Sequence, residues 1–505
     1  MTISNEEIKA ELAEVIEELF LHSGERGQAS FQKQMTEMIA IISRTFQESS
    51  APYIGKQPEM VQEEIATLLK FPSEAQNFTE LLQEIAEPIL KNSLQVSHEK
   101  SIAHLHCPPL ISAIAAELVI SSFNQSLDSW DQSTAATYLE QEMIKWLTKK
   151  FGYKATSDGT FTSGGTQSNY TGLLLARDEF CYRKWGREVK RDGLPSQFHK
   201  LRILCSEDAH FTVQKTAAQL GLGENAVIKV KVDEHHRMSP MYLKKQLIDL
   251  KEKDLLPFAL IGTCGTTDFG SIDPLVELAT IAKQEELWFH VDAAYGGALI
   301  LSESHNWKLE GIKEADSITV DFHKLFYQPI SCGAFLVKNS QSFHFLNHHA
   351  DYLNPIEDEG EGIPNLVNKS IVTSRRFDAF KLFLSLKTVG INLFSEMIDA
   401  TFYLAQETAN YLSHQPNIKV ENKNPELNTV IFRFEPQTST GDVCKLNRKI
   451  QQEMLYESKA AIAKTSVNGR TYLKFTMLNP RTKMEHIYEI VEEIQTLGSK
   501  WREHT

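Results

Sequence analysis

The chain has 505 residues, of which 42% are hydrophobic and 23% charged, and its formal net charge is −14. This length is typical of two or three domains, and the composition is that of a soluble globular protein. The acidic balance argues against nucleic acid or an anionic membrane as partner, because phosphate surfaces are bound by basic stripes. The six cysteines are scattered and no signal-peptide pattern opens the chain, which predicts a reduced, cytoplasmic protein without a metal site.

Residues 1–104 are predicted to form an N-terminal helical segment. Apolar residues recur at three- and four-residue steps between Ile8 and Phe20, and similar patterns run through 30–48 and 58–70. Each apolar face needs a partner. The body of the chain and a second copy are equally good candidates at this point.

Residues 105–385 show short apolar runs that alternate with helical patterns. The runs predicted as strands are Arg202–Cys205, Ala226–Val232, Phe258–Thr263, Leu287–Val291, Ser317–Val320 and Gly333–Val337, and the helical patterns lie at 168–185, 212–220, 240–252 and 273–285. This alternation predicts an α/β domain with a largely parallel sheet. In such a sheet, ligands bind at the carboxyl ends of the strands.

A loop and a smaller domain are predicted to follow. Asp351–Asn368 has no apolar periodicity, and its length favours a functional loop. It carries the acidic side chains Asp351, Glu357, Asp358, Glu359 and Glu361. Residues 386–505 are predicted to form a small α+β domain, with helices at 392–412 and 483–497 and strands at Val430–Phe434 and Tyr472–Met477.

A glycine-rich segment precedes the first helical pattern of the α/β region. It reads TSGGTQSN over Thr162–Asn169, and its glycines would allow a ligand to approach the backbone. The following helix N-terminus suits a phosphate, with Gly165 and Thr166 as candidate contacts. A plain capped glycine turn is the alternative.

Three further candidates follow predicted strands. His210 could stack on an aromatic cofactor, or it could be an ordinary hydrogen-bonded loop histidine. Asp292 ends an apolar strand, where a carboxylate needs a positive partner such as a protonated pyridine nitrogen; Ala294 leaves room beside such a ring, and a helix cap is the alternative. Lys324 could point into the ligand crevice, where apolar surroundings would free its amine for imine formation, or it could be a solvated lysine.

In this order the motifs resemble the group II pyridoxal-dependent amino-acid decarboxylases, a family that acts on glutamate, aromatic amino acids, histidine, sulfinoalanine and diaminobutyrate. The resemblance rests on TSGGTQSN, SEDAHFT, VDAAYGG and VDFHKL, and on STAATYLE, in which Thr134 replaces the usual proline. It spans 85–500. The chain length and His104–Pro109 are most similar to the bacterial L-2,4-diaminobutyrate decarboxylases.

The resemblance implies a fold and a set of residue roles. The fold is that of the type I pyridoxal-phosphate enzymes, similar to aspartate aminotransferase, with a mostly parallel seven-stranded sheet and a homodimeric assembly. Lys324 would carry pyridoxal 5'-phosphate as a Schiff base. The other implied contacts are Asp292 at the pyridine nitrogen, His210 on the ring, Gly165, Thr166 and His323 at the phosphate, and Thr266 and Ala294 beside the cofactor.

The resemblance also implies residues that act on the substrate. Tyr352 matches a tyrosine of a mobile loop that is needed for correct protonation. Lys474 stands where several relatives have an arginine for the substrate's α-carboxylate, and it lacks the bidentate fork of arginine. His106 is a second candidate for substrate binding.

The expected reaction is decarboxylation of an L-amino acid, with L-2,4-diaminobutyrate favoured and 1,3-diaminopropane and CO₂ as products. The loop carboxylates would pair with the distal ammonium or merely solvate the loop. Another amino-acid decarboxylase is the first alternative. An aminotransferase, a cysteine desulfurase, for which Cys332 is a poor nucleophile, and a non-catalytic dimeric binding protein are less favoured.

Overall fold

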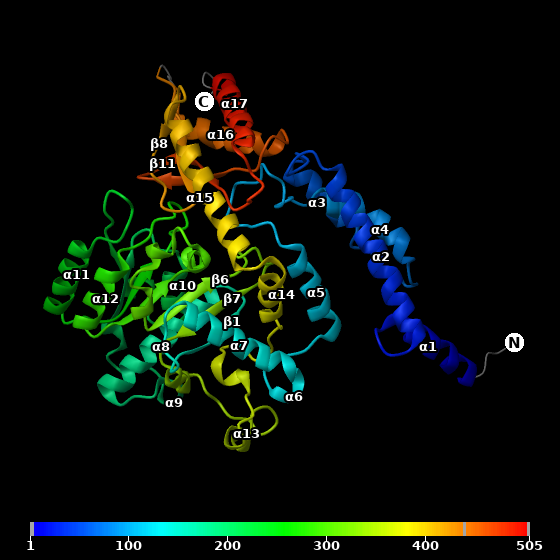
Figure 1. The fold of residues 1–505 in the computed structure, drawn as a ribbon, viewed down its shortest axis with the longest axis horizontal. Helices are drawn as coiled ribbons and strands as arrows, with labels where there is room; N and C mark the ends of the chain where they lie inside the picture. Colours follow the sequence, from blue (N-terminus) through cyan, green and yellow to red (C-terminus); the bar gives the residue numbers. More distant parts are fainter. Residues whose placement is uncertain (1–4, 438–440, 502–505) are drawn as a thin grey trace.

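The computed structural model describes residues 5–437 and 441–501 (Figure 1). Its N-terminal part forms the predicted helices, and they extend as an arm beside the rest of the chain (Figure 1). These elements are α1 (Asn5–Leu19), α2 (Glu25–Glu48), α3 (Pro58–Thr67), α4 (Phe78–Ile85) and a π-helical turn, η1 (Ala86–Lys91).

A seven-stranded sheet forms the centre of the molecule, with strand order β1-β7-β6-β5-β4-β2-β3. The strands are β1 (Asp158–Thr162), β2 (Leu201–Ser206), β3 (Val227–Val230), β4 (Leu256–Thr263), β5 (Trp288–Asp292), β6 (Ser317–Asp321) and β7 (Gly333–Val337). The pairs from β3 to β6 are parallel, and β7 is antiparallel to both of its neighbours. The expected mostly parallel seven-stranded α/β fold is confirmed.

Helices cover both faces of this sheet. The helices that pack on its strands are α7 (Ala135–Lys150), α8 (Gly165–Trp185), α10 (Thr212–Gln219), α11 (Pro240–Glu252) and α12 (Leu275–Gln284). The helices α5 (Ile111–Phe123), α6 (Trp130–Ser133), α9 (Val189–Asp192) and α14 (Ala379–Val389) pack on other helices. Short 3₁₀ helices are η2 (Phe198–Lys200), η3 (Glu224–Ala226), η4 (Gly296–Leu301), η5 (Asn306–Leu309), η6 (Ile312–Glu314) and η7 (Ser340–Phe345). The strands β5, β6 and β7 are buried along their whole length, because helices cover both faces of the sheet.

The segment Asp351–Asn368 is not a plain loop, which corrects the expectation. It contains the short helix α13 (Ile356–Glu361), and the 3₁₀ helix η8 (Leu366–Lys369) follows at its end. Pro355 precedes α13 and acidic residues fill its first turn, an arrangement that favours a helix N-terminus.

A four-stranded antiparallel sheet forms the C-terminal part, in the order β10-β11-β9-β8. Its elements are β8 (Ile418–Val420), β9 (Thr429–Phe434), β10 (Ala463–Val467), β11 (Arg470–Thr476), α15 (Ile391–Ser413), α16 (Val443–Tyr456) and α17 (Met484–Trp501). The division of the chain into 1–104, 105–385 and 386–505 stays a prediction. Within the described ranges, no helix is both long and apolar enough to cross a membrane.

Candidate active site

A cavity of about 270 Å³ lies at the carboxyl ends of the parallel strands. The sheet brings the loops after β1, β2, β4, β5 and β6 to this edge, as the position rule for α/β sheets requires. Seven of the predicted site residues line it: Gly165, Thr166, His210, Asp292, Ala294, His323 and Lys324.

The glycine-rich loop forms one wall of the cavity. Gly164 has φ +144°, and a Cβ added there would lie 2.8 Å from His323 Cε1. Gly165 begins α8, a helix of 21 residues whose N-terminus therefore faces the cavity. Backbone N–H groups at such an end suit an anion, so the geometry fits the predicted phosphate contact.

Asp292 ends β5 and is only 8% exposed. Its Oδ2 accepts a hydrogen bond from Asn169 Nδ2 at 2.8 Å, and its Oδ1 accepts one from the Ala294 N–H at 3.1 Å. Among the described residues no lysine or arginine forms an ion pair with it. A carboxylate held by neutral donors and open to the cavity fits a cationic ligand atom such as a protonated ring nitrogen.

Lys324 lies in the cavity, but its surroundings are not apolar. Its Nζ is 3.3 Å from Asp321 Oδ2, because the two residues are three positions apart on the turn after β6. His323 Nε2 lies 3.6 Å from the same oxygen. The expectation of an apolar surround is therefore corrected: a buried carboxylate faces the amine.

His210 follows β2 and lines the cavity from another side. Its Nδ1 is 3.0 Å from Thr212 Oγ1, and burial lowers the pKa of its imidazole. The His210 ring is therefore neutral, and Thr212 holds it in a fixed orientation that suits stacking on a cofactor.

Two buried oxygen atoms at the cavity lack a hydrogen-bond partner among the described residues. They are Thr263 Oγ1 and Asp321 Oδ1, and both residues line the cavity. Buried polar groups are normally paired, so these atoms mark a place for a polar ligand. Together with the glycine wall, Asp292 and Lys324, they fit pyridoxal phosphate.

Four predicted residues are not brought to the cavity lining: Thr266, Tyr352, Lys474 and His106. Thr266 is 1% exposed, and its Oγ1 accepts a hydrogen bond from the Ser271 N–H inside a turn, while Thr267 beside it lines the cavity. Tyr352 is 88% exposed. Its loop is held at the base by Asn354, which donates to the His348 carbonyl and accepts from the Ala350 N–H.

Lys474 lies at the rim of the cavity, because it bonds to Thr267, which lines it. Lys474 Nζ is 3.1 Å from Asp268 Oδ1 and 3.2 Å from the carbonyl of Thr267. The rings of His104 and His106 are 6.3 Å apart, and partial burial and the charge of Lys474 lower the pKa of His104. The cation predicted at Lys474 is thus present, and it forms an ion pair with the carboxylate of Asp268.

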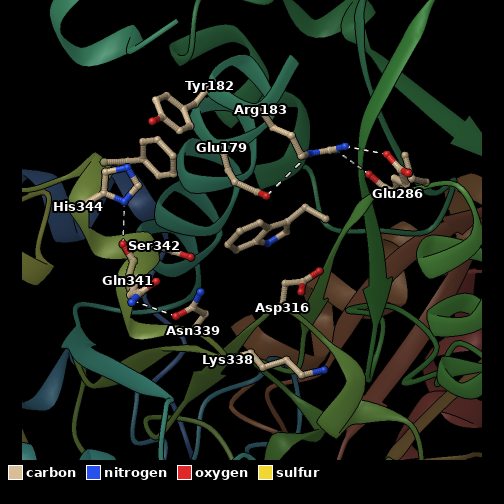
Figure 2. Close-up of a pocket in the computed structure, with 13 residues that line it drawn as sticks. Glu179, Tyr182, Arg183, Glu286, Asp316, Lys338, Asn339, Gln341, Ser342 and His344 are labelled. Atoms are coloured by element: carbon tan, nitrogen blue, oxygen red, sulfur yellow. Dashed lines mark hydrogen bonds and ion pairs between the residues drawn. The ribbon is translucent and has the colours of Figure 1, made fainter. Parts of the chain in front are cut away.

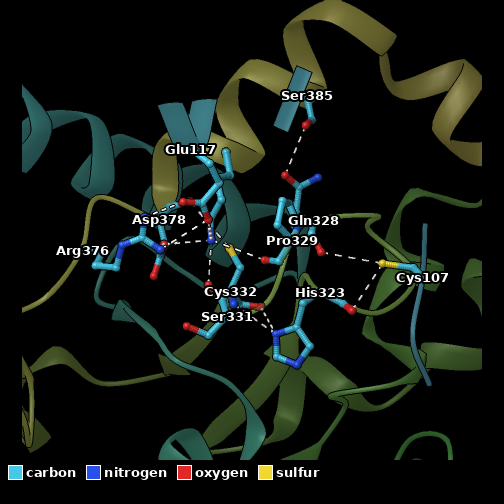
Figure 3. A network of polar contacts seen from close by, with 11 residues as sticks. Cys107, Glu117, His323, Gln328, Pro329, Ser331, Cys332, Arg376, Asp378 and Ser385 are labelled. Carbon is cyan, nitrogen blue, oxygen red and sulfur yellow. Dashed lines mark hydrogen bonds and ion pairs between the residues drawn. The ribbon is translucent and has the colours of Figure 1, made fainter. Parts of the chain in front are cut away.

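A buried ionic network behind the cavity holds the segment after Lys324 (Figure 3). Lys381 is fully buried, and its Nζ lies 2.8 Å from Glu117 Oε1, 2.9 Å from Asp378 Oδ1 and 2.8 Å from the Ser331 carbonyl. The next residue, Cys332, is buried and holds His323 Nδ1 at 2.8 Å through its carbonyl. The network therefore positions His323, and Cys332 does not line the cavity.

A larger cavity of about 490 Å³ lies at the opposite edge of the sheet (Figure 2). Trp288 at the start of β5, Asp316 before β6 and Lys338 after the antiparallel β7 place it there. Arg183 on its wall bonds Glu286 at 2.8 Å. The position rule and the predicted residues both point to the smaller cavity. In the described part of the chain, no group of three or more His, Cys, Asp or Glu side chains is arranged to hold a metal ion.

Six polar residues that line the cavity were not among the predicted site residues: Ser163, Asn169, Thr263, Thr267, Tyr295 and Asp321. Asn169 stands within TSGGTQSN and Asp321 within VDFHKL, so the motifs contained them. Their roles depend on contacts across the sheet, which spacing along the chain does not reveal.

Comparison with known proteins agrees with this geometry. Residues 58–435 match the model of the pyridoxal-dependent decarboxylase conserved domain. The chain is 38% identical to an L-2,4-diaminobutyrate decarboxylase of Acinetobacter baumannii, covering 92% of both proteins, and 36% identical to one of Rhizobium meliloti, covering 94% of this chain and 93% of the relative.

A solved structure is similar over almost the whole chain. It is the glutamate decarboxylase domain of a diaminobutyrate–pyruvate transaminase and L-2,4-diaminobutyrate decarboxylase from Vibrio parahaemolyticus, with a TM-score of 0.89, 38% identity and coverage of 97% of this chain and 99% of that one. The chain therefore belongs to the pyridoxal-dependent decarboxylase family, and its cofactor is pyridoxal 5'-phosphate.

Proposed function

We propose that the chain decarboxylates L-2,4-diaminobutyrate to 1,3-diaminopropane and CO₂. The observation that carries the reaction type is the cavity that unites Lys324, Asp292 and His210 in a chain of the decarboxylase family. The substrate is supported by relatives of that name, at 36–38% identity over more than nine tenths of the chain.

Each of the cavity residues has a separate role in binding the cofactor. Lys324 would hold the cofactor covalently, Asp292 would face its ring nitrogen, and His210 would cover one face of its ring. Gly165, Thr166 and His323 would bind the phosphate, and Ala294 would leave space beside the ring. When bound, pyridoxal phosphate accepts the electron pair of the breaking Cα–carboxylate bond.

Tyr352 returns a proton to the substrate Cα after its loop closes. Support comes from its place on an exposed segment anchored at Asn354, which leaves the tyrosine free to move. A closed loop would also exclude water from the reacting carbon.

The rim supplies the charges that recognise a dibasic amino acid. Lys474 attracts the α-carboxylate, and Asp268, whose side chain is 46% exposed, attracts the distal ammonium. Of the five loop carboxylates proposed from the sequence, Asp351, Glu357, Asp358 and Glu361 do not line the cavity, and Asp358 accepts a hydrogen bond from Asn365. The side chain of Glu359 lies outside the described part of the structure.

The experiment is a substrate panel: purified enzyme with diaminobutyrate, glutamate, ornithine, histidine and aromatic amino acids, followed by amine formation and CO₂ release. Diaminobutyrate should have the highest kcat/KM. Asp268→Asn should raise the KM for diaminobutyrate about tenfold or more, whereas Asp351→Asn, the matched loop control, should not. Preference for glutamate or an aromatic substrate would contradict the proposal.

We also propose a cytoplasmic homodimer. All six cysteines are unpaired, which suits a reducing compartment. The arm and α5 expose large apolar side chains: Leu12, Val15, Ile16, Leu19, Phe20, Ile111, Ile114, Leu118 and Phe123. Such a surface is typical of an obligate interface.

Light scattering would test the assembly. A double variant with Ile111→Glu and Phe123→Glu should shift the protein to the monomer mass. Ile248→Glu, on the exposed side of α11, is the control and should remain dimeric.

A further inference from the structure

One buried amide, that of Asn169, contacts Asp292 directly and is connected to His210 through Thr212. Asn169 lies on α8, one turn beyond Gly165, and is 2% exposed. Its Nδ2 is 2.8 Å from Asp292 Oδ2 and 3.1 Å from Thr212 Oγ1. Because an ionised carboxylate only accepts hydrogen bonds, this nitrogen is the donor in both contacts.

The other end of the amide accepts two hydrogen bonds. Asn169 Oδ1 lies 2.7 Å from Thr319 Oγ1 and 3.0 Å from His290 Nε2. Both donors and both acceptor positions of the amide are therefore used, which fixes its orientation. Asn169 therefore accepts hydrogen bonds from the side of Thr319 and His290 and donates them to Asp292 and Thr212.

The chain of hydrogen bonds extends from Asn169 through His290 to residues farther along the sheet. Burial lowers the pKa of this imidazole to about 4, so it is neutral and carries one N–H. With Nε2–H donating to Asn169, His290 Nδ1 accepts the Ser317 hydroxyl at 2.8 Å, and Ser317 Oγ accepts the Trp288 indole N–H at 2.9 Å. A relay of donors thus runs from Trp288 through Ser317, His290 and Asn169 to the carboxylate.

A glycine makes room for this relay. Gly172 lies on α8 opposite β5, and a Cβ there would lie 2.7 Å from His290 Nδ1 and 3.3 Å from Ser317 Oγ. Any side chain at this position would displace the imidazole. The helix is therefore shaped to carry Asn169 and to admit His290 behind it.

A second branch leads from the same amide to His210. Thr212 Oγ1 accepts from Asn169 Nδ2, so its own proton is available for His210 Nδ1 at 3.0 Å. The Thr212 N–H points to the same ring nitrogen at 3.4 Å. Two donors at Nδ1 require that nitrogen to be unprotonated, which leaves the His210 proton on Nε2.

We propose that Asn169 is a positioning residue that orients the Asp292 carboxylate toward the cofactor ring nitrogen and fixes the Nε2–H form of His210. The proposal rests on the proposed contact between Asp292 and that nitrogen. A carboxylate held in place by Asn169 and Ala294 would pair with a protonated ring nitrogen, and this pairing would keep the proton on the ring. One side chain thereby orients both the group that would face the ring nitrogen and the group that would cover the ring.

The test reads the ring nitrogen directly. Enzyme reconstituted with pyridoxal phosphate labelled with ¹⁵N in the ring is examined by NMR, alongside kcat and KM. Wild type should show the protonated ring. Asn169→Leu, which has a similar shape but no amide, should move the ¹⁵N shift toward the unprotonated value and lower kcat roughly 10- to 100-fold.

Two milder variants separate the branches and serve if Asn169→Leu fails to fold. Ser317→Ala weakens the branch to Asp292 and should move the ¹⁵N shift in the same direction, by less. Thr212→Val removes the branch to His210 and should leave the ¹⁵N shift unchanged while kcat falls. An unchanged ¹⁵N shift in Ser317→Ala, or in a folded Asn169→Leu, would overturn the proposal. The NMR measurement needs no substrate, so absence of diaminobutyrate turnover in wild type would contradict only the proposed function.

Discussion

The carboxyl-end edge of the seven-stranded sheet encloses a cavity of about 270 Å³, whereas the opposite edge carries one of about 490 Å³. The larger cavity is lined by charged side chains that pair with one another near solvent, such as Arg183 with Glu286. The smaller one gathers buried groups from five loops, and two of its oxygens lack partners in the described structure. Convergence of constrained polar groups, rather than volume, therefore distinguishes the reactive edge.

Lys324→Ala should have the largest effect. Removal of the amine eliminates the covalent anchor, so nearly all turnover and the absorbance of the bound cofactor should be lost. Lys338→Ala, at the larger cavity, is the control and should keep both. Steady-state activity retained by the first variant would assign the anchor elsewhere.

Asp292→Ala should come next. Removing one partner of a buried charge pair costs about 3–5 kcal/mol, which predicts a loss in kcat of roughly 10³-fold. The comparison sharpens if Asp316→Ala, a carboxylate of the larger cavity, changes kcat less than about twofold. Equal losses in kcat for Asp292→Ala and Asp316→Ala would show that the two edges of the sheet do not differ in their importance for the reaction.

Tyr352→Phe should lower the rate of amine formation by roughly 10²-fold, as expected for loss of a positioned proton donor. Abortive transamination should rise, because the carbanion would then be protonated at another atom. Product analysis by chromatography measures both. Normal rate and yield would remove Tyr352 from the reaction.

Arg183→Ala should have the smallest effect. Its ion pair with Glu286 is exposed, and such pairs contribute about 0–1 kcal/mol to the free energy of unfolding. Activity should stay within about twofold of wild type, and a urea titration should show little change. A large loss of activity would give the second cavity a role in the reaction.

Much of this architecture was predictable from local pattern. The strands β2 to β7 are runs of apolar residues, and their alternation with helices predicted the parallel sheet and its reactive edge. β1 was not among the predicted runs because Asp158–Thr162 contains one strongly apolar residue, Phe161, and owes its place to pairing with β7.

The site residues also fall into those that the sequence pattern predicted and those that it did not. Residues at or shortly after the ends of strands, such as Asp292 and Lys324, were predictable because strand ends meet at one edge. The contact between Asp321 and Lys324, and the position of Asn169 between Asp292 and Thr212, were not, since they depend on side-chain direction across elements. Thr266 shows the same limit: a one-residue difference places Thr267 at the cavity and Thr266 inside the turn.

Borohydride reduction followed by peptide mapping tests the central claim most directly. Reduction of the holoenzyme links the cofactor permanently to the lysine that carries it, and mass spectrometry of the digest identifies that residue. The account predicts a single labelled peptide that contains Lys324. Label on Lys338 or another lysine, or no label on a yellow holoenzyme, would contradict it.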